Sequence, residues 1–359
     1  MKKSRIMHAL MLIIVVALIA TNVNAKEVRW KMASTWVPSI NLIDADRYFV
    51  RNANDLLKGK MKIDFFEGGV LMPIFEVFDA VSEGMLQATG DAPLYWSGKD
   101  LVFETLGSYP MGMTAMDMYV WINAGEGQAI YDEAYGKFNM KYLVTGITPS
   151  ESGLRSNKPL TGLKDLKGMK VRMSGNTQGK ILKEAGAAAI MMSGQEIYQA
   201  LQKGVIDAGE FCTPFCDWGM GFQEVTKYWL GPGWHQPSCL CGAAINKPAW
   251  DALDEELQTA LKIAAMAGSM EFVCKQYYGS MEYMQKFIDA GTTISKYSDE
   301  ELDQIARWAN KFTEERAKQS EGFKKSMKSQ VEFRKNFADW REFEGRFSFG
   351  WTPSEFPNL

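Results

Sequence analysis

The chain has 359 residues, of which 46% are hydrophobic and 23% are charged, an ordinary globular balance. That length suggests two domains, each able to bury its own core. Lysine and arginine total 40 against 43 acidic residues, so the chain lacks the excess of basic residues that is typical of nucleic-acid-binding proteins. The two histidines, His8 and His235, argue against a histidine-rich metal centre. After the N-terminus, no stretch approaches the roughly 18 apolar residues of a membrane span.

The first 25 residues are predicted to form a secretory signal peptide. Three cations open the chain: Lys2, Lys3 and Arg5. An apolar core of about 12 residues follows, too short for a comfortable membrane span. Val23 and Ala25 are small residues at the two recognition positions of a cleavage site. We therefore expect cleavage after Ala25 and export to the periplasm, with a retained N-terminal anchor as the alternative.

All five cysteines lie in the second half of the chain. In an oxidising compartment, the favoured interpretation is a disulfide between the Cys212/Cys216 pair and the Cys239/Cys241 pair. Five is an odd number, so at least one of Cys212, Cys216, Cys239, Cys241 and Cys274 is left over unless it pairs between chains. The CxxxC and CxC spacings do not match a standard zinc pattern, which disfavours a structural metal.

Strands and helices alternate along the N-terminal half. Residues 28–32 alternate apolar and polar side chains, which predicts a strand, and helical spacing follows over 42–56. A period of two resumes at 61–65, and a helix around 74–83 leads into a strand at 86–89. This β-α-β order indicates α/β lobes with largely parallel sheets.

The second half repeats this order and then becomes helical. A strand at 169–173 leads into a helix from 176 to 185, and Ser193 with Glu196 forms a capping box before a helix ending at 202. Residues 205–210 form a further strand. The last hundred residues are predicted as helices over 250–267, 270–289 and 298–323. No low-complexity linker separates two independent domains, which favours lobes joined by crossing strands.

The generic enzyme signatures are missing: the sequence has no GxSxG, no GxGxxG after the first strand, no P-loop and no HExxH. Three short segments stand out instead. Arg172 is at the end of a predicted strand, and in an open α/β lobe the ligand crevice lies at the strand ends. The planar guanidinium of Arg172 suits a bidentate contact with a carboxylate. Residues 207–211 (DAGEF) deliver a carboxylate to the same edge, and residues 231–236 (GPGWHQ) place an aromatic and an amide after a turn.

Together these segments resemble the periplasmic substrate-binding subunits of tripartite ATP-independent periplasmic (TRAP) transporters, the DctP-type family. The most specific stretch runs from Leu163 to Phe222 and contains LKDLKGMKVRMSGN and GQEIYQALQKGVIDAGEF. The resemblance implies an α/β, two-lobed periplasmic-binding-protein fold with crossing strands and long C-terminal helices. It places lobe I at 26–149 plus 238–277 and lobe II at 150–237 plus 278–359.

The resemblance also implies a site. Arg172 matches the arginine that clamps a ligand carboxylate. The chain further resembles the branch that binds 2-oxo or 2-hydroxy acids through a metal ion, where Glu210, the Phe211 carbonyl and Gln236 would hold Na⁺ or Ca²⁺ bridging to the ligand. Oxygen-only ligation suits such a hard cation. No organic cofactor and no catalytic residue are implied.

One departure from that branch lies in residues 149–153 (PSESG), which lack the amide expected before the Arg172 strand. Glu151 or Ser150 could substitute for it. In the metal-free alternative, Arg155 acts as a second arginine on the carboxylate. The remaining candidate ligand-binding residues are Trp36, Tyr95, Trp96, Asn176, Phe211 and Trp234.

The sequence therefore predicts a solute-binding protein that captures an organic carboxylate. A 2-oxo or 2-hydroxy monocarboxylate, with an apolar or aromatic tail, is the expected ligand. The resemblance implies delivery to the membrane subunits of a TRAP-type permease, with the binding protein as a monomer or homodimer. A secreted enzyme on the same scaffold and a ligand-sensing module for a membrane receptor are the alternatives.

Overall fold

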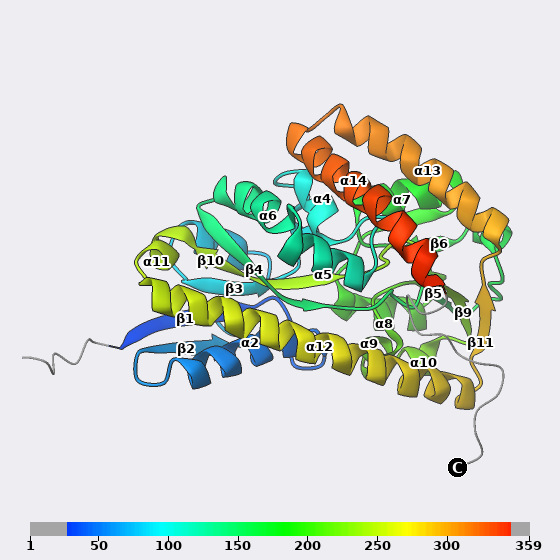
Figure 1. Ribbon diagram of the computed structural model, residues 1–359. Coiled ribbons are helices and arrows are strands. Elements are labelled where there is room, and N and C mark those ends of the chain that lie inside the picture. The colour runs from blue at the N-terminus through cyan, green and yellow to red at the C-terminus, as the bar shows by residue number, and fades with distance from the viewer. Residues whose placement is uncertain (1–26, 346–359) are drawn as a thin grey trace, which may run out of the picture.

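Two β-sheets, each flanked by helices, carry the architecture (Figure 1). The computed structural model describes residues 27–345. The predicted signal peptide and its cleavage site lie outside the described residues. Within 27–345, none of the helices is both long and apolar enough to span a bilayer.

The first sheet has five strands in the order β2-β1-β3-β10-β4. Strand β1 pairs in parallel with β2 and with β3, whereas β10 runs antiparallel to both β3 and β4. The strands are β1 (Val28–Ser34), β2 (Met61–Phe66), β3 (Ala88–Asp91), β4 (Met140–Ile147) and β10 (Leu240–Asn246). The three N-terminal strands confirm the predicted β-α-β order, since α2 (Ile43–Leu56) connects β1 to β2.

The second sheet has six strands in the order β11-β9-β5-β8-β6-β7. Parallel pairs join β11 to β9, β8 to β6 and β6 to β7, while β5 runs antiparallel to β9 and β8. The strands are β5 (Leu154–Ser156), β6 (Lys170–Arg172), β7 (Ala188–Ile190), β8 (Ala208–Gly209), β9 (Tyr228–Gly231) and β11 (Thr293–Lys296). Strand β8 covers only two residues of the predicted strand at 205–210.

The chain crosses between the sheets in two short segments. Residues 148–153 connect β4 of the first sheet to β5 of the second, and residues 232–239 lead back from β9 to β10. Because the two segments end in different sheets, side chains on them lie between the two halves of the molecule.

Helices cover both sheets (Figure 1). In the first half they are α3 (Val77–Ser82), the 3₁₀ turn Pro93–Trp96, α4 (Val102–Gly107), α5 (Ala115–Ala124) and α6 (Gly127–Gly136). In the second half they are the 3₁₀ turn Leu163–Leu166, α7 (Asn176–Glu184), α8 (Gly194–Gln202), α9 (Pro214–Gly219), α10 (Phe222–Val225), α11 (Lys247–Asp251), α12 (Glu255–Asp289), α13 (Asp299–Ala317) and α14 (Glu321–Glu344). Helix α14, assigned to lobe II from the sequence, packs against α4, α5 and α6 as well as α13.

The long C-terminal helices differ from the predicted ones in three places. The predicted helix at 250–267 begins only at Glu255, where Asp254 caps α12, and residues 250 and 251 belong to α11. Helix α12 is continuous where the sequence predicted a break after residue 267. Gly268 packs against α2, where a Cβ would lie 3.1 Å from the backbone nitrogen of Phe49, so this glycine permits close helix packing and does not end the helix. The predicted helix at 298–323 is two helices, because Ser320 caps a new one by accepting from the Phe323 amide at 3.2 Å.

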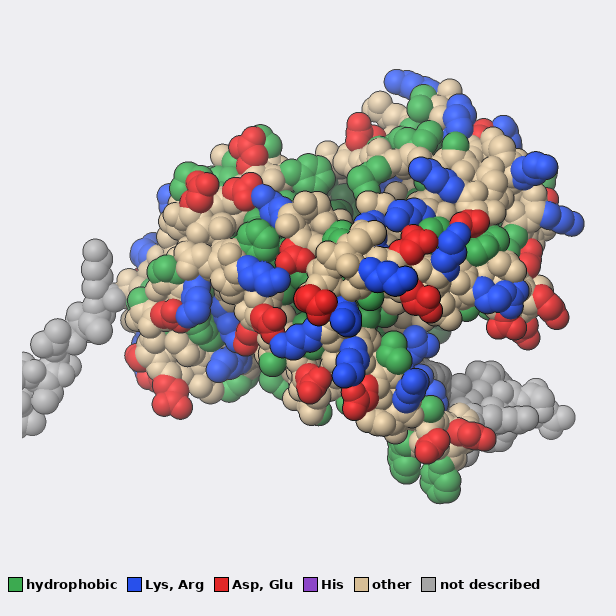
Figure 2. Space-filling model, turned by 90° about the horizontal axis from the view of Figure 1, so that it is seen from above, with side chains coloured by type: hydrophobic (Ala, Val, Ile, Leu, Met, Phe, Trp, Pro, Cys, Tyr) green, Lys and Arg blue, Asp and Glu red, His purple; other side chains and the backbone are tan. Residues whose placement is uncertain are grey.

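Charged side chains of both signs are interspersed over the face seen in Figure 2. Lysine and arginine do not gather there into a single basic patch. This distribution agrees with the near balance of charges in the sequence.

Candidate functional site

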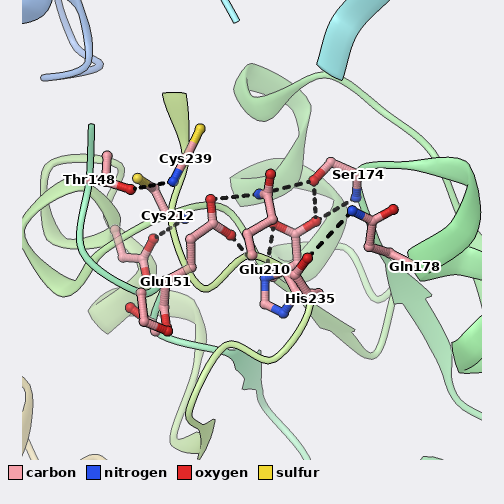
Figure 3. Close-up of polar contacts among 12 residues, drawn as sticks. Thr148, Glu151, Ser174, Gln178, Glu210, Cys212, His235 and Cys239 are labelled. Atoms are coloured by element: carbon pink, nitrogen blue, oxygen red, sulfur yellow. Dashed lines mark hydrogen bonds and ion pairs between the residues drawn. The ribbon is translucent and has the colours of Figure 1, made fainter. Parts of the chain in front are cut away.

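A cluster of polar side chains lies where the two crossing segments meet the ends of β6 and β8 (Figure 3). Glu151 comes from the β4–β5 crossing, and His235 and Gln236 come from the β9–β10 crossing. Arg172 is the last residue of β6, and Glu210 directly follows β8. The parallel pairing of β6 with β8 brings these two ends to the same edge of the sheet.

The guanidinium of Arg172 is held on two sides. Its Nε and Nη2 atoms donate to the carbonyl oxygen of Met192 at 3.2 and 3.1 Å. Its Nη1 atom donates to Glu210 twice, to the carbonyl oxygen at 2.8 Å and to Oε1 at 2.7 Å. With only 3% of the residue exposed, these contacts fix the orientation of the fork.

The two carboxylate oxygens of Glu210 have different surroundings. Oε1 accepts from Arg172 and from the backbone amide and hydroxyl of Ser174. Oε2 is buried without a hydrogen-bond partner and lies 3.8 Å from Nε2 of His235. A buried carboxylate oxygen without a partner is costly, so Oε2 marks the point where this cluster has free capacity to bind.

Glu151 is buried beside this point and is held by both residues of the other crossing segment. Its Oε2 lies 2.9 Å from Nε2 of His235, and its Oε1 accepts from Nε2 of Gln236 at 2.6 Å. Burial raises the pKa of Glu151 to about 7, against the effect of the hydrogen bond with His235. Burial lowers the pKa of His235, but the hydrogen bond to Glu151 and the charges of Glu210 and Glu151 outweigh it, and the pKa is raised.

The arrangement can hold a hard cation. Glu151, Glu210 and His235 each offer one ligand atom, and these atoms lie within 4.8 Å of one another. Nε2 of His235 faces Glu151, and Gln236 uses its amide nitrogen toward Glu151, which leaves its amide oxygen for another partner. Two carboxylates and an amide oxygen are the ligands that Na⁺ and Ca²⁺ prefer.

Two adjoining cavities lie against this cluster. The smaller, about 30 Å³, is lined by Trp36, Tyr95 and Phe211 together with Glu151, Arg172 and Gln236. The larger, about 730 Å³, shares Tyr95, Arg172, Ser174 and Leu94 with the first. Its wall is mostly apolar and includes Phe75, Met173, Met191 and Met192. The polar cluster therefore opens toward a larger, apolar space.

A family model for bacterial extracellular solute-binding proteins, family 7 (DctP), matches residues 32–320. The chain belongs to this family. The match confirms the resemblance on which the two-lobed fold was predicted.

Three similar proteins extend the comparison. The monocarboxylate 2-oxoacid-binding periplasmic protein of a Nostoc species is 28% identical over 87% of this chain and 86% of its own length. A TRAP transporter solute-binding protein from Bordetella bronchiseptica, a mixed-occupancy dimer with calcium and picolinate in one active site, is 27% identical with a TM-score of 0.83, covering 88% of this chain and 94% of its own. A TRAP periplasmic solute-binding protein from Pseudoalteromonas atlantica, with bound sodium and pyruvate, is 25% identical and also has a TM-score of 0.83. The match covers 90% of this chain and 98% of that protein.

The structure brings most of the residues predicted from the DctP resemblance into one place. Arg172, Glu151, Glu210 and Gln236 form the polar cluster, and Phe211, Trp36 and Tyr95 line the smaller cavity. Asn176, at the start of α7, lines the larger cavity. Of Ser150 and Glu151, the two candidates for the missing amide, Glu151 is the one that reaches the cluster.

Two of the predicted aromatic residues do not line either cavity. The indole of Trp96 points into the first lobe, where its nitrogen donates to Asp91 at 2.6 Å. Trp234 is buried in the core cluster around β6 and α13 and meets His235 edge-on at 5.7 Å between ring centroids. Trp96 thus packs beside Tyr95 of the cavity wall, and Trp234 packs beside His235 of the polar cluster.

Arg155 occupies a different environment from the one proposed for a second carboxylate clamp. Its guanidinium lies 3.8 Å from the ring centroids of both Trp229 and Phe287, and its Nε donates to Asp217 at 3.1 Å. The side chain is completely buried and lines neither cavity. Arg155 and Arg172 flank Gly209 of β8 from its two neighbouring strands, but the Arg155 guanidinium is enclosed by Trp229, Phe287 and Asp217, so the structure does not place it where the metal-free alternative requires it.

The predicted disulfide is wrong, since all five cysteines are free thiols. Cys212 contacts Cys216, and Cys239 contacts Cys241. Burial raises the pKa of the Cys212 thiol well above its usual range. The four buried cysteines therefore pack as small side chains in the core.

Sequence reasoning missed the role of His235, which connects Glu151 to Glu210. The histidine stands next to Gln236 within the GPGWHQ segment, and that position was a usable signal. The carbonyl of Met192 and the hydroxyl of Ser174 were missed as well, and neither carries a signal in the sequence.

A further buried carboxylate, Asp46, lies behind Trp36 of the cavity wall. Ser34 donates from Oγ to Asp46 at 2.6 Å and accepts from the amide of Trp36 at 2.9 Å. Burial, with the charge of Asp91 nearby, raises the pKa of Asp46 from its usual 3.8 to about 8. The folded protein therefore keeps a proton that the unfolded chain loses.

This raised pKa predicts a pH-dependent stability. Because the folded state binds the additional proton, the free energy of unfolding should fall by up to about 1.4 kcal/mol per pH unit as pH rises from about 4 toward 8. The isosteric Asp46→Asn variant removes this titration, so its melting temperature should depend less on pH over that range. Equal slopes for the two proteins in thermal melts would contradict the assignment.

Proposed function

We propose that this protein captures a 2-oxo or 2-hydroxy monocarboxylate together with a cation and delivers the ligand to the membrane subunits of a TRAP-type permease. The observation that carries the proposal is Glu210, which pairs with Arg172 through one oxygen and keeps the other unpartnered beside Glu151. In this arrangement Arg172 takes the ligand carboxylate. The cation, held by Glu210, Glu151, Gln236 and the Phe211 carbonyl, binds the ligand's 2-oxygen.

The carboxylate of Glu151 distinguishes this site from the branch that it resembles, where an amide is expected. Glu151 must lose its proton to bind a cation, and a divalent ion stabilises the charged carboxylate more strongly than a monovalent one. We therefore favour Ca²⁺ over Na⁺ for this chain. The relatives from Bordetella and Pseudoalteromonas support both ions, with calcium in the first and sodium in the second.

The apolar wall of the larger cavity supports a ligand with an apolar or aromatic tail. A carboxylate on Arg172 would leave the rest of the molecule beside Tyr95 and Leu94, which line both cavities. Methionines 173, 191 and 192 then offer adaptable apolar contacts. A cavity of about 730 Å³ falls in the usual size range of small-ligand sites.

We further propose periplasmic localisation after cleavage behind Ala25. The two lobes would close on the ligand by hinge motion. Lobe I comprises 26–149 plus 238–277, and lobe II comprises 150–237 plus 278–359. Glu151, His235 and Gln236 lie on the crossing segments, so a hinge there would change the site directly. Relatives in the family support a periplasmic, non-catalytic role.

Native mass spectrometry of freshly purified protein tests the proposal most directly. We expect an adduct whose mass equals one monocarboxylate plus one cation, with the cation identified by elemental analysis. Incubation with a panel of 2-oxo acids should return them unchanged, since binding without turnover is expected. Product formation would favour the enzyme alternative, and a protein that binds no 2-oxo acid would contradict the proposal.

A further inference from the structure

A separate cavity, of about 290 Å³, lies at the outer edge of the first sheet. Strand β4 is the edge strand there, next to β10. Its alternate side chains enter two core layers, since Tyr142 packs with α5 and α6 whereas Leu143 packs with α12 (Figure 1). The cavity is the gap between these layers. We call it the edge cavity, and its walls include Ile122, Leu143, Lys262, Ala265, Met266 and Ser269.

The floor of the edge cavity is apolar. Ile122 from α5, Leu143 from β4 and Ala265 from α12 line it and are each at most 5% exposed. Met266 stands at the rim, 49% exposed, and its thioether offers an adaptable contact to a ring. An apolar floor inside a concave wall suits the apolar body of a small ligand.

One polar atom interrupts this floor. Ser269 lines the edge cavity and is 1% exposed, and its hydroxyl oxygen has no hydrogen-bond partner within residues 27–345. Ser280 on the same helix instead donates to the carbonyl of Gln276 at 2.6 Å, the usual local bond of a helical serine. Because an unpaired buried hydroxyl is costly, Ser269 is prepared to exchange a hydrogen bond with a ligand.

The rim of the edge cavity carries one uncompensated positive charge. Lys141 lines the cavity but lies 2.5 Å from Asp132, which also accepts from Gln128 at 2.8 Å. Lys262 forms no ion pair in the described part of the chain, and its ammonium lies 5.9 Å from the ring centroid of Trp250. An anion at the rim would therefore gain a counter-charge from Lys262.

The spacing of Lys262 and Ser269 limits the shape of the ligand. The two residues are seven apart on α12, so they lie on one face of the helix, about 10 Å apart along its axis. An aromatic ring with a carboxylate at one end and a hydroxyl at the other spans this distance when the flexible lysine side chain leans toward it. A volume of about 290 Å³ is at the lower end for small-ligand sites, which fits a single ring.

We propose that the edge cavity is a second ligand site, which takes a small aromatic carboxylate with a hydroxyl opposite the carboxylate. The carboxylate binds Lys262, the ring packs on Ile122 and Leu143, and the hydroxyl pairs with Ser269. Among the described residues, the edge cavity shares no lining residue with the two cavities at the polar cluster. The second site is thus independent of the proposed function, and either could hold without the other.

Methyl NMR of the full chain without its signal peptide, labelled at the methionine methyl groups, tests the proposal with 4-hydroxybenzoate as the probe. Met266 lines the edge cavity, whereas Met173, Met191 and Met192 line the larger cavity at the polar cluster. We expect a saturable shift of the Met266 signal, with a dissociation constant on the order of 0.1–1 mM for a ligand of this size. The Met266 signal is assigned by its loss in Met266→Leu.

Lys262→Glu tests the anion contact. It should weaken the binding reported by Met266 at least about tenfold, because a like charge replaces the counter-charge. Lys328→Glu is the matched control, since Lys328 is also exposed, lies on the long helix α14, forms no ion pair within residues 27–345 and does not line the edge cavity. This variant makes the same change in net charge and should leave the affinity unchanged.

Ser269→Ala tests the hydroxyl contact. It should weaken the binding of 4-hydroxybenzoate by roughly 2- to 12-fold, the usual range for one hydrogen bond. Benzoate has no hydroxyl, so it should bind the wild-type protein and Ser269→Ala equally well. A general change in the fold would weaken both ligands, and thermal melts of each variant measure any such change.

The proposal is overturned by a Met266 signal that stays in place at about 10 mM probe, by shifts confined to Met173, Met191 and Met192, or by equal loss of affinity in Lys262→Glu and Lys328→Glu. A titration with pyruvate, followed at Met192, tests the proposed function separately. Failure of one site is therefore distinguishable from failure of the other.

Discussion

Replacing Arg172 with alanine is expected to weaken the binding of a 2-oxo acid by roughly 30-fold to several thousand-fold, or about 2–5 kcal/mol. The guanidinium is almost completely buried and is oriented by the Met192 carbonyl and by Glu210. In the proposed site, its removal would delete the guanidinium that faces the ligand carboxylate, and it leaves Glu210 without its counter-charge. Isothermal titration with pyruvate and with an aryl 2-oxo acid measures the loss for a short and a long ligand.

Arg172→Lys separates charge from geometry in the same experiment. Lysine keeps the positive charge but cannot donate to Met192 and Glu210 as a planar fork, so it should recover little of the lost affinity. The melting temperature of each variant, measured without ligand, shows how much of the effect comes from destabilisation. A change in affinity of less than about threefold in both variants would place Arg172 outside the ligand site.

The sequence was sufficient to predict those parts of the fold that depend on local pattern. The β-α-β order of the first lobe and the capping box at Ser193 follow from the spacing of nearby residues, and the structure confirms them. Arg172 and Glu210 were also predictable as partners in one site, because ends of parallel strands meet at one edge of a sheet. Strand β8 brings them to hydrogen-bonding distance.

Features that depend on distant contacts could not be derived in this way. Glu151 and His235 stand 84 residues apart and meet because two crossing segments lie side by side. The disulfide was wrong because residues near in sequence, Cys212 with Cys216, turned out to be the ones in contact. Nothing local distinguishes Gly268 as a packing residue from a helix-ending glycine, since only α2 lying against it decides the outcome.

Replacing Glu210 with glutamine should weaken the binding of pyruvate by at least about tenfold, given that replacing even the outer partners of metal ligands costs roughly 10- to 100-fold. The amide keeps the size of the side chain but loses the charge that holds a cation against its hydration shell. A chelator should weaken binding to the wild-type protein by a similar factor and should have little further effect on Glu210→Gln, because both changes remove one interaction.

Two comparisons make this result specific to the cation. Propionate, which has the carbon skeleton of pyruvate without the 2-oxygen, should bind the wild-type protein poorly and should not respond to the chelator. Asp207→Asn is the matched control, because Asp207 precedes β8 and pairs with Lys158 at 2.7 Å, and this variant should keep the chelator response.

If binding were tight, insensitive to chelator and free of metal by elemental analysis, Arg172 would be the only arginine on the anion, since Arg155 is enclosed by Trp229, Phe287 and Asp217. The unpartnered oxygen of Glu210 favours the cation-dependent outcome, because a cation supplies the partner that this oxygen otherwise lacks.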